Sequence, residues 1–420
     1  MGQSRDAFFI GNQWVPPASD RRFELINAST EEVIGTVPEA VEADIDAAVA
    51  AARKAFDGSG WSDAKPAERA SAMQRFAEAI AEKSPIGVAA AIVPWNFPVT
   101  LALSKIAPAM IAGCTMVIKP SPGTVLDSYI LAEAALEADL PPGVLNWVAA
   151  DRDAGAYLVS HPDVDKVAFT GSTAVGRMIA RTCGELLRPV TLELGGKSAA
   201  ILLEDADIDI FMDNILFTSL LHSGQTCFNG TRILAPKKRH AEIVDALVAS
   251  VETLQIGDAL DPATQLGPLA SRAQRQKVED YIAIGKDEGR IVTGGGRPRN
   301  TERGWFVEPT VITDLHNSDR IAQEEIFGPV LAVIAYDGEE EAIRIANDSP
   351  FGLGGSVWSA DTGRATSVAQ KIQSGTVGVN GYQPLLGAPF GGIKASGLGR
   401  EFGPETVTAY QNVKSIYMIG

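Results

Sequence analysis

The chain has 420 residues, of which 45% are hydrophobic, so two or three globular domains with a cleft between them are expected. A net charge of −16 disfavours binding to nucleic acid or to an anionic membrane, and no apolar run reaches the length of a membrane-spanning helix, so the expected partner is a small molecule. Three cysteines and four histidines, in no zinc-binding spacing, argue against a disulfide framework and a metal site and favour the cytoplasm.

The first half of the chain predicts a parallel α/β sheet. Short strands are expected within 8–15 and 23–37, followed by helices over 44–56 and 66–83. Strand-like runs at 88–92, 115–118, 144–148 and 166–170 then alternate with helical stretches at 129–137 and 154–160. Alternation of strands with helices is typical of a parallel sheet covered by helices, so the predicted fold class is α/β.

A second α/β pattern follows Gly195 and Gly196. It predicts helices over 208–222, 240–254 and 339–347, strands over 232–234 and 330–335, and loops at 266–269 and 294–296. The two halves meet near Gly195, so a cleft between them would lie between Glu193 and Cys227. Candidate functional residues are therefore expected on both sides of this junction.

A turn at 171–176 is a candidate phosphate-binding site. The strand at 166–170 runs into Gly171 and, after Gly176, into a helix. Backbone N–H groups at the start of such a helix point at a phosphate, so a dinucleotide is the natural ligand. The spacing has neither the Lys-Ser/Thr of a P-loop nor the GxGxxG pattern, and a plain strand-to-helix turn is the alternative.

Cys227 differs from the other two cysteines in its surroundings. Cys114 lies in an apolar run and Cys183 on a helix, so both are expected to be buried small side chains. Cys227 follows the polar stretch 222–226, at the end of a predicted helix, where a thiol could reach a cleft. It is the candidate nucleophile, with an inert thiol as the alternative. For His222 a capping or surface role is predicted rather than a thiol-histidine pair.

Glu193 and Asn96 are the candidate base and oxyanion donor. Glu193 lies in an apolar strand pattern, where burial would raise the pKa of its carboxyl group and make it a usable general base. A buried carboxylate satisfied by backbone N–H groups is the alternative. Asn96 is held between Pro94 and Pro98 in a stiff loop, where its amide could donate to an oxyanion, and a turn-forming asparagine is the alternative.

Seven segments, taken together, resemble the signature of the aldehyde dehydrogenase superfamily and occur in the family's order. They are Pro94-Trp95-Asn96-Phe97-Pro98, Lys119-Pro120-Ser121, Phe169-Thr170-Gly171-Ser172, Leu192-Glu193-Leu194-Gly195-Gly196-Lys197, Gly224-Gln225-Thr226-Cys227, Glu324-Glu325-Ile326-Phe327-Gly328-Pro329, and Pro389-Phe390-Gly391-Gly392 with Ser396-Gly397-x-Gly399-Arg400-Glu401. The resemblance covers nearly the whole chain. It implies a Rossmann-like coenzyme-binding domain over 1–195, an α/β catalytic domain over 196–395, and a return segment with a C-terminal oligomerisation strand over 396–420.

The resemblance also implies NAD(P)-dependent oxidation of an aldehyde to a carboxylic acid. Cys227 would attack the aldehyde and form a thiohemiacetal, whose oxyanion is held by the Asn96 amide and the Cys227 backbone N–H. After hydride leaves for the nicotinamide, Glu193 would activate the water that hydrolyses the thioester. Lys105 and Glu401 match family positions thought to relay protons.

The coenzyme contacts of the family map onto a further set of positions. Lys119 matches the ribose-binding lysine, and the pyrophosphate turn and the nicotinamide-ribose clamp follow it along the chain. The expected set is Ile92, Trp95, Asn96, Lys119, Ser121, Pro122, Gly171, Ser172, Val175, Leu194, Glu325 and Phe327. Pro122 stands where many relatives carry a glutamate that repels a 2′-phosphate, so NAD is expected first and NADP remains open.

Six positions match the family's aldehyde tunnel: Phe97, Leu101, Ser104, Phe228, Leu385 and Phe390. They are mostly apolar and none is charged, so the resemblance implies a neutral aliphatic or aromatic aldehyde. Ser104 replaces the bulky aromatic residue of some relatives and would widen the tunnel.

The chain departs from the family between Ser84 and Pro85. Typical members have several dozen further residues there, including helices and the first strands of an oligomerisation sheet. The junction is sterically acceptable because proline ends a helix naturally. Part of the tunnel wall and of the subunit contact should be missing, and the run at 413–418 should be left as an exposed strand edge. A homodimer is therefore expected, with a less stable tetramer than relatives form.

Two other functions remain open from the sequence. A CoA-acylating semialdehyde dehydrogenase shares the chemistry as far as the thioester, but it often lacks the base that Glu193 would supply. A non-catalytic nucleotide-binding relative, inactivated by the missing segment, is the alternative from a different class. Formation of NADH from a panel of aldehydes would distinguish these possibilities.

Overall fold

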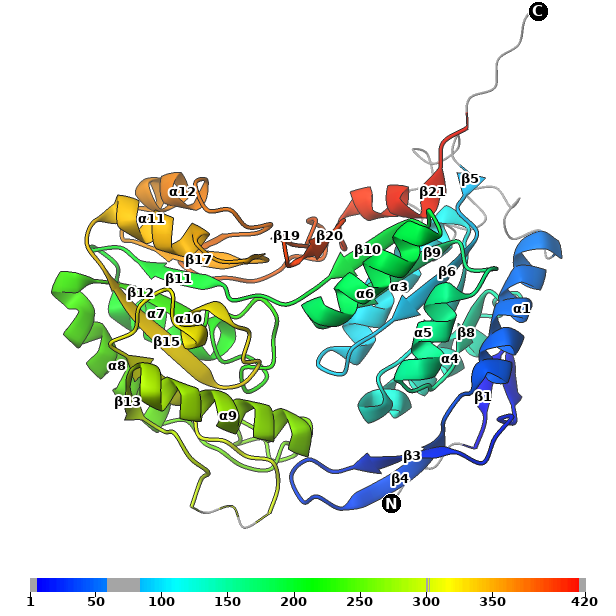
Figure 1. The fold of residues 1–420 in the computed structure, drawn as a ribbon, viewed down its shortest axis with the longest axis horizontal. Helices are drawn as coiled ribbons and strands as arrows, with labels where there is room; N and C mark the ends of the chain where they lie inside the picture. The colour runs from blue at the N-terminus through cyan, green and yellow to red at the C-terminus, as the bar shows by residue number, and fades with distance from the viewer. Residues whose placement is uncertain (1–5, 59–83, 300, 302, 415–420) are drawn as a thin grey trace, which may run out of the picture.

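The computed structural model describes residues 6–58, 84–299, 301 and 303–414. These residues form two α/β lobes that lie side by side, one around an eight-stranded sheet and the other around a seven-stranded sheet (Figure 1). The α/β fold class is confirmed. The helix predicted over 66–83 lies outside the described residues. None of the described helices is both long and apolar enough to cross a membrane.

The first lobe is built on the eight-stranded sheet. In order across the sheet its strands are β2 (Gln13–Val15), β1 (Phe8–Ile10), β8 (Leu145–Trp147), β7 (Thr115–Lys119), β6 (Val88–Ile92), β9 (Lys166–Thr170), β10 (Val190–Glu193) and β20 (Gly397–Leu398). The five strands from β8 to β10 are parallel. The chain winds outward from β6 in both directions, and ligands bind to open parallel sheets at such a switch point, here between β6 and β9.

Helices cover both faces of this sheet. α1 (Glu42–Gly58), α5 (Arg152–Ser160) and α6 (Thr173–Glu185) enclose one core cluster, and α3 (Pro98–Ala112), α4 (Val125–Glu137) and the 3-10 helix η4 (Pro404–Tyr410) enclose the other. α3 has Pro98 in its first turn, where a proline sacrifices no hydrogen bond, and it ends at Gly113 in the left-handed conformation. α6 starts after Ser172, whose hydroxyl accepts the N–H of Val175.

The second lobe repeats this layered plan around the seven-stranded sheet. Its strands in order are β13 (Arg290–Thr293), β14 (Thr310–Thr313), β15 (Val330–Tyr336), β12 (Arg232–Pro236), β11 (Ala199–Leu202), β17 (Gly355–Trp358) and β18 (Gly378–Val379). α7 (Ile208–Thr218) and α8 (His240–Glu252) pack on one face, and α9 (Arg272–Glu288), α10 (Arg320–Gln323), α11 (Glu339–Asn347) and α12 (Thr362–Ala369) pack on the other. Short connections are η2 (Pro122–Thr124), η3 (Lys237–Arg239) and the pair β16 (Phe351–Gly352) with β19 (Ile393–Lys394).

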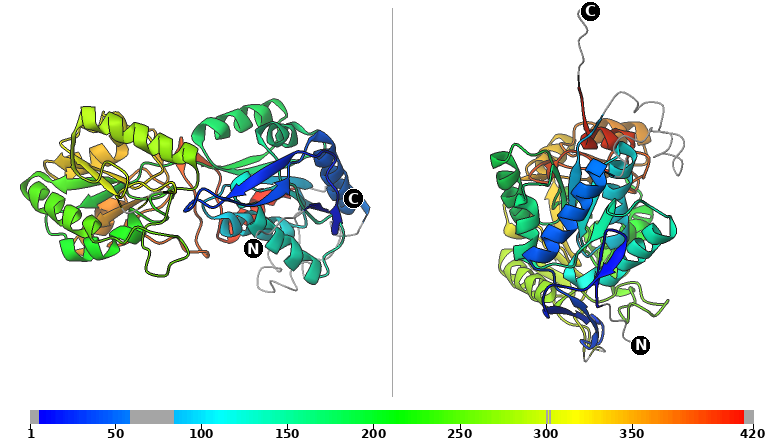
Figure 2. Two further views of the ribbon diagram at one scale, coloured as in Figure 1. Left: turned by 90° about the horizontal axis from the view of Figure 1, so that it is seen from below. Right: turned by 90° about the vertical axis from the view of Figure 1, so that its right-hand side faces the viewer.

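A hairpin formed by β3 (Arg22–Ile26) and β4 (Val33–Pro38) reaches from the first lobe to the second. The view from below shows it lying between the two lobes (Figure 2). At its tip the carboxylate of Glu31 accepts the backbone N–H of Gly304 at 2.9 Å and pairs with Arg272 at 3.1 Å. The backbone N–H of Trp305 donates to the carbonyl of Ala28 at 3.0 Å. These contacts tie the N-terminal segment to the far lobe.

The predicted elements agree with the structure except at a few places. The helix predicted over 339–347 has the bounds of α11, whereas α3, α9 and α12 were not predicted. The helix predicted over 208–222 ends at Thr218, because His222, Ser223 and Gly224 all have φ between +56° and +78°, which no right-handed helix accommodates. Cys227 therefore lies in a loop and not at the end of a helix.

At the C-terminal edge a short strand pairing comes just before the run at 413–418. Gln411 and Asn412 form the strand β21, which pairs antiparallel with Ser84 and Pro85 in β5. The two residues that precede the run therefore have a partner, formed by the two residues at the junction. Val413, the next residue, has 79% of its side chain exposed. Residues 415–418 of the run lie outside the described residues.

Candidate active site

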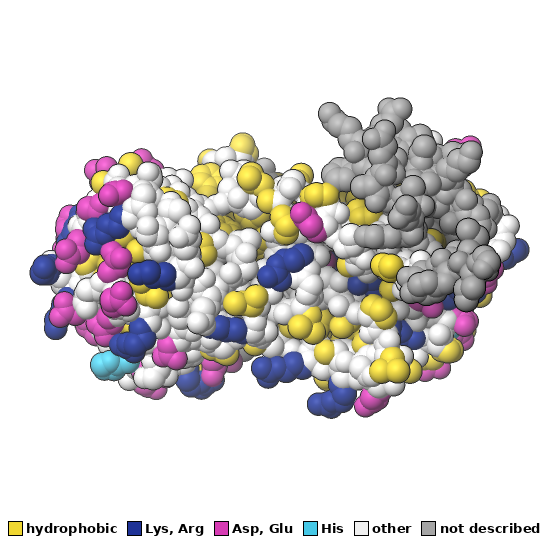
Figure 3. Space-filling view, turned by 90° about the horizontal axis from the view of Figure 1, so that it is seen from above, with side chains coloured by type: hydrophobic (Ala, Val, Ile, Leu, Met, Phe, Trp, Pro, Cys, Tyr) yellow, Lys and Arg dark blue, Asp and Glu magenta, His cyan; other side chains and the backbone are white. Residues whose placement is uncertain are grey.

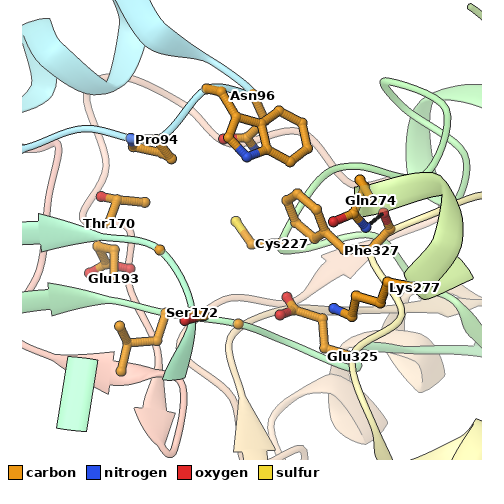
Figure 4. A pocket seen from close by; sticks show the side chains of 14 residues that line it. Pro94, Asn96, Thr170, Ser172, Glu193, Cys227, Gln274, Lys277, Glu325 and Phe327 are labelled. Carbon is orange, nitrogen blue, oxygen red and sulfur yellow. Dashed lines mark hydrogen bonds between the residues drawn. The ribbon is translucent and has the colours of Figure 1, made fainter. Parts of the chain in front are cut away.

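A pocket of about 170 Å³ lies at the carboxyl ends of β6, β9 and β10, where the first lobe faces the second. It is lined by Pro94, Trp95, Asn96, Thr170, Gly171, Ser172, Glu193, Leu194, Gly195, Cys227, Gln274, Lys277, Glu325 and Phe327. The first nine come from the first lobe and the last five from the second (Figure 4). The pocket thus occupies the switch point between β6 and β9, and it brings together nine of the residues predicted from the sequence.

Cys227 is the cysteine that reaches the pocket. Its sulfur lies in the middle of the pocket, between Asn96 and Glu193 (Figure 4). The residue is partly exposed to solvent, but most of the space around its sulfur is filled by protein. This burial raises the pKa of the thiol far above its ordinary value. The charges of Glu325 and Glu193 raise it further. Cys114 and Cys183 are fully buried, as predicted.

Glu193 ends β10 with only 3% of its surface exposed. Neither carboxylate oxygen has a hydrogen-bond partner among the described residues, so the alternative of a carboxylate satisfied by backbone N–H groups is wrong for this part of the chain. Burial raises the pKa of Glu193 well above its ordinary value, and the charge of Glu401 raises it further. A carboxylate of high basicity that faces the same pocket as a thiol can act as a proton acceptor.

Asn96 lies in the loop between β6 and α3, where Pro98 starts the helix. Its side-chain nitrogen donates to the backbone carbonyl of Gln225 at 3.0 Å, and the residue is 9% exposed. An amide nitrogen carries two hydrogens, so one remains for a ligand in the pocket. Because Gln225 precedes Cys227 by two residues, this hydrogen bond also fixes Asn96 relative to the thiol.

The chain crosses from the first lobe to the second through Gly195 and Gly196, where an added side chain would displace Glu325 or meet the backbone of Cys227. A Cβ atom on Gly195 would lie 2.5 Å from a carboxylate oxygen of Glu325, and one on Gly196 would lie 2.4 Å from the carbonyl oxygen of Cys227. The N–H of Gly196 donates to Glu325 at 3.1 Å. The crossing therefore holds Cys227 and Glu325 of the second lobe against Glu193 of the first.

Lys105 and Glu401 lie immediately behind the pocket. The ammonium nitrogen of Lys105 is 2.6 Å from a carboxylate oxygen of Glu401 and donates to the hydroxyl of Thr170 at 2.7 Å. The other oxygen of Glu401 accepts the hydroxyl of Ser104 at 2.7 Å. All four side chains are buried, and Thr170 lines the pocket. The two predicted relay residues are thus connected to the pocket through Thr170, which the sequence reasoning missed.

The start of α6 opens into the pocket through Gly171 and Ser172. This 13-residue helix has its free N–H groups at that end, which makes it a site for a phosphate. Across the pocket, Phe327 packs edge-on against Trp95 with ring centroids 5.5 Å apart. Glu325 lies beside Lys277, and burial raises the pKa of the Glu325 carboxyl group.

The remaining predicted coenzyme residues do not line the pocket but follow the same edge of the sheet. Ile92 ends β6, Lys119 ends β7, Val175 lies in the first turn of α6, and Ser121 and Pro122 start η2. The ammonium group of Lys119 donates to the backbone carbonyls of Pro120 and Ala150 at 2.9 and 3.0 Å. Burial lowers the pKa of Lys119 to about 8.

The residues predicted for the tunnel do not line this pocket. Phe97 and Leu101 belong to the start of α3, and the Phe97 ring packs edge-on against His222 with centroids 4.4 Å apart. The rings of Phe228 and Phe390 are 6.0 Å apart. Leu385 is 64% exposed, so it lies at the surface and not in an enclosed tunnel.

Five pocket residues were missed by sequence reasoning: Pro94, Thr170, Gly195, Gln274 and Lys277. Three of them stand inside recognised segments. Gln274 and Lys277 come from α9, a polar helix whose sequence looks like a solvated surface helix, and no local signal marked them. Among the described residues, no group of three or more His, Cys, Asp or Glu side chains could hold a metal ion.

Comparison with known sequences gives one family. A sequence model of the aldehyde dehydrogenase family matches residues 14–84 and 79–416. A geranial dehydrogenase from Castellaniella defragrans is 50% identical over 471 aligned positions, which cover 98% of each chain. A chloroplastic betaine aldehyde dehydrogenase from Beta vulgaris is 38% identical, with 97% of this chain and 95% of the relative covered.

Solved structures agree with the sequence comparison. An aldehyde dehydrogenase from Mycobacterium tuberculosis, in complex with NAD+, has 43% sequence identity and a TM-score of 0.95 over 100% of both chains. A mutant of aldehyde dehydrogenase C from Pseudomonas syringae, in complex with NAD+ and octanal, has 35% identity and a TM-score of 0.93, with 99% of this chain and 98% of that chain covered.

The sequence matches also locate the departure from these relatives. The two segments matched by the family model meet at 79–84. The 471 aligned positions outnumber the 420 residues of the chain, so the geranial dehydrogenase has a stretch with no counterpart here. The break in the match coincides with the junction of Ser84 and Pro85, where the resemblance predicted a missing segment.

Proposed function

The chain belongs to the aldehyde dehydrogenase family, and from this premise we propose how its own residues oxidise an aldehyde to a carboxylic acid with NAD+. The observation that carries the proposal is the pairing, in one pocket, of the Cys227 thiol with the buried and unpartnered carboxylate of Glu193. A nucleophile and a strong base at one site are what acyl transfer requires.

The residues that line the pocket suit parts of the coenzyme. The N-terminus of α6 at Gly171 and Ser172 suits a pyrophosphate, and the close approach of Gly195 to Glu325 leaves that carboxylate facing the pocket as an acceptor for ribose hydroxyls. Trp95 and Phe327 supply apolar walls. When bound, NAD+ supplies the acceptor for the hydride that converts the thiohemiacetal into a thioester.

In the first half of the reaction Cys227 is the nucleophile. Its raised pKa means that the thiol is protonated at rest, so a base must take the proton as sulfur attacks the aldehyde carbon. Water in the pocket takes this proton, which leaves the carboxylate of Glu193 free for the second half of the reaction. The Asn96 amide, held by the carbonyl of Gln225, and the backbone N–H of Cys227 then hold the oxyanion of the thiohemiacetal.

In the second half Glu193 activates water. A water hydrogen passes to the carboxylate while the oxygen bonds to the thioester carbon, and the carbon–sulfur bond breaks to release the acid and the Cys227 thiolate. The raised pKa of Glu193 suits this step, because a carboxylate of ordinary pKa is a weak base at neutral pH. A buried base of this kind also favours hydrolysis over transfer to CoA.

The proposed substrate is a neutral, apolar aldehyde. The residues matching the tunnel contain no charge, and the ring of Phe228, the residue after Cys227, packs against that of Phe390. The relative that shares 50% identity is a geranial dehydrogenase, and a solved neighbour is complexed with octanal, both of them uncharged aldehydes. We propose the cytoplasm as its compartment, since none of the three cysteines is paired.

We predict that Cys227→Ala lowers aldehyde oxidation by at least about 10⁴-fold while NAD+ binding is retained, because the nucleophile is lost and the start of α6 is untouched. NADH absorbance with a panel of aldehydes measures the first effect, and calorimetry with NAD+ alone measures the second. Cys114→Ala and Cys183→Ala are the controls and should keep activity. Turnover by Cys227→Ala at the parent rate would exclude Cys227 as nucleophile.

Glu193→Gln should form one equivalent of NADH rapidly and then turn over about 10²–10⁴-fold more slowly than the parent, because the amide cannot accept a proton from water. The parent's steady rate should rise with pH over a range above 4.5, the ordinary pKa of the group, since a raised pKa delays ionisation of the base. The variant should lack this rise. Absence of the NADH burst in a single turnover would mean that Glu193 is also needed to activate Cys227.

Pro122→Glu should shift preference toward NAD+ over NADP+ by about 1–3 kcal/mol, because a carboxylate at the start of η2 would repel a 2′-phosphate. The measurement is the ratio of kcat/KM for the two coenzymes. Pro122→Gln is the matched control, since it has the same size without the charge. An unchanged ratio in Pro122→Glu would show that the adenosine ribose does not lie near η2.

For the assembly we propose a homodimer with a weakened tetramer. The pairing of β21 with β5 is only two residues long, and Val413 beyond it is exposed, so this edge offers little to a neighbouring subunit. Light scattering across a range of protein concentrations should show a dimer that fails to reach a stable tetramer. A single tetrameric species at low concentration, with ordinary turnover, would contradict this prediction.

A further inference from the structure

A second cavity, of about 690 Å³, lies between α3 and the segment that contains η4. Its lining is mostly apolar and consists of Thr100, Leu103, Ser104, Ala107, Pro108, Ile111, Leu386, Gly387, Phe402, Gly403, Pro404, Thr406 and Val407. Leu103 and Leu386 are 44% and 73% exposed, so the cavity opens to solvent. Seen from above, hydrophobic side chains gather along the junction of the two lobes (Figure 3). This cavity shares no lining residue with the active-site pocket.

Ser104 connects this cavity to the buried acid behind the active site. Its hydroxyl lies 2.7 Å from a carboxylate oxygen of Glu401 and 3.0 Å from the backbone carbonyl of Leu101. A hydroxyl has one hydrogen and rotates freely, so it can turn between acceptors while its own oxygen accepts another hydrogen. The hydroxyl of Thr406, in the same cavity, donates instead to the backbone carbonyl of Phe402.

A continuous line of polar groups joins the two cavities. It runs from Ser104 through Glu401 and Lys105 to Thr170, with separations of 2.7, 2.6 and 2.7 Å. Ser104 lines the outer cavity and Thr170 lines the active-site pocket. The side chains of Glu401 and Lys105, in the middle, are 3% and 0% exposed, so bulk water does not reach them directly.

The chemistry requires such a path. Each hydrolysis of the thioester leaves a proton on Glu193, whose carboxylate is buried and has no hydrogen-bond partner among the described residues. That proton must leave before Glu193 can act again. The negative charge of Glu401 lies close enough to raise the pKa of Glu193, so the Lys105–Glu401 pair is suited to receive the proton next.

We propose that Ser104 is the outlet of this relay and passes the proton from Glu401 to water in the apolar cavity. The proposal rests on the function proposed above. The proton taken from water by Glu193 passes to the Lys105–Glu401 pair. The Ser104 oxygen then accepts a proton from Glu401 while the Ser104 O–H bond gives its hydrogen to a water molecule in the cavity. No charge remains on the serine, and Glu193 and Glu401 return to their ionised state.

This role explains a residue that a tunnel function leaves unexplained. Ser104 stands where the resemblance places a bulky aromatic side chain in some relatives, which could not exchange protons with Glu401. Here a small hydroxyl faces the carboxylate, and the space beside it is an open cavity. Ser104 acts through Glu401, and we therefore regard it as a relay and positioning residue and not as a catalytic residue.

Ser104→Val and Ser104→Thr test the proposal, because the two side chains have the same shape and differ in the hydroxyl. The measurements are stopped-flow NADH formation and proton release, followed with a pH indicator dye in weakly buffered octanal and NAD+, together with steady-state kcat and KM. Ser104→Val should keep the NADH burst and KM but slow proton release and kcat by about 10²-fold, the lower end of the range for lost proton transfer. Ser104→Thr should restore both.

Thr406→Val is the control, because it removes a hydroxyl from the same cavity that does not contact Glu401. This variant should behave like the parent. Parent-like proton release and kcat in Ser104→Val would overturn the proposal. It would also be overturned if Ser104→Thr were as slow as Ser104→Val, since the defect would then follow the shape of the side chain. Absence of NADH formation by the unmodified chain would instead contradict the proposed function.

Discussion

The chemistry proposed for the pocket depends on one constraint: the carboxylate of Glu193 is buried, and neither of its oxygens has a hydrogen-bond partner among the described residues. Such a group costs folding free energy unless it takes up a proton, which is why its pKa rises. The sheet holds it in place because β10 is paired on both edges, with Glu193 opposite Thr170 on β9 and Gly397 on β20. The return segment closes over it, since a Cβ atom on Gly391 would lie 2.3 Å from the carboxylate. The stability of the central strands thus maintains a strong base.

The second requirement is that a thiol from another lobe meets this carboxylate. The lobes are brought together by close packing of Gly195 on the Glu325 carboxylate and of Gly196 on the Cys227 backbone, and by the hydrogen bond from Asn96 to the loop before Cys227. After α7, three consecutive residues at 222–224 have the left-handed backbone conformation, and they turn the chain toward the pocket. The position proposed for the nucleophile therefore depends on the way the two sheets are joined.

The sequence was sufficient for the central strands of the first sheet and for residues inside recognisable segments, whereas β11, β13, β14, β17 and β18 of the second sheet were not predicted. β6, β7, β8 and β9 are apolar runs buried on both faces, and such runs are readable because side chains there have no other role. Residues such as Lys277 were not readable, because they come from a polar helix brought to the pocket by tertiary packing. The contact of Ser104 with Glu401 joins residues 297 positions apart, and no local pattern encodes it. The loop position of Cys227 was missed because left-handed conformations at non-glycine residues have weak sequence signals.

The hairpin of β3 and β4 has a mechanical consequence. The lobes are already joined by the crossing at Gly195 and by the return segment that contributes β20 to the first sheet. The hairpin adds a third attachment at the opposite edge, through Glu31 and the carbonyl of Ala28. Two bodies fastened at separate edges cannot swing apart about a single hinge. A hinge-like separation of the lobes for entry or exit of coenzyme would therefore first have to break the contacts of the hairpin tip.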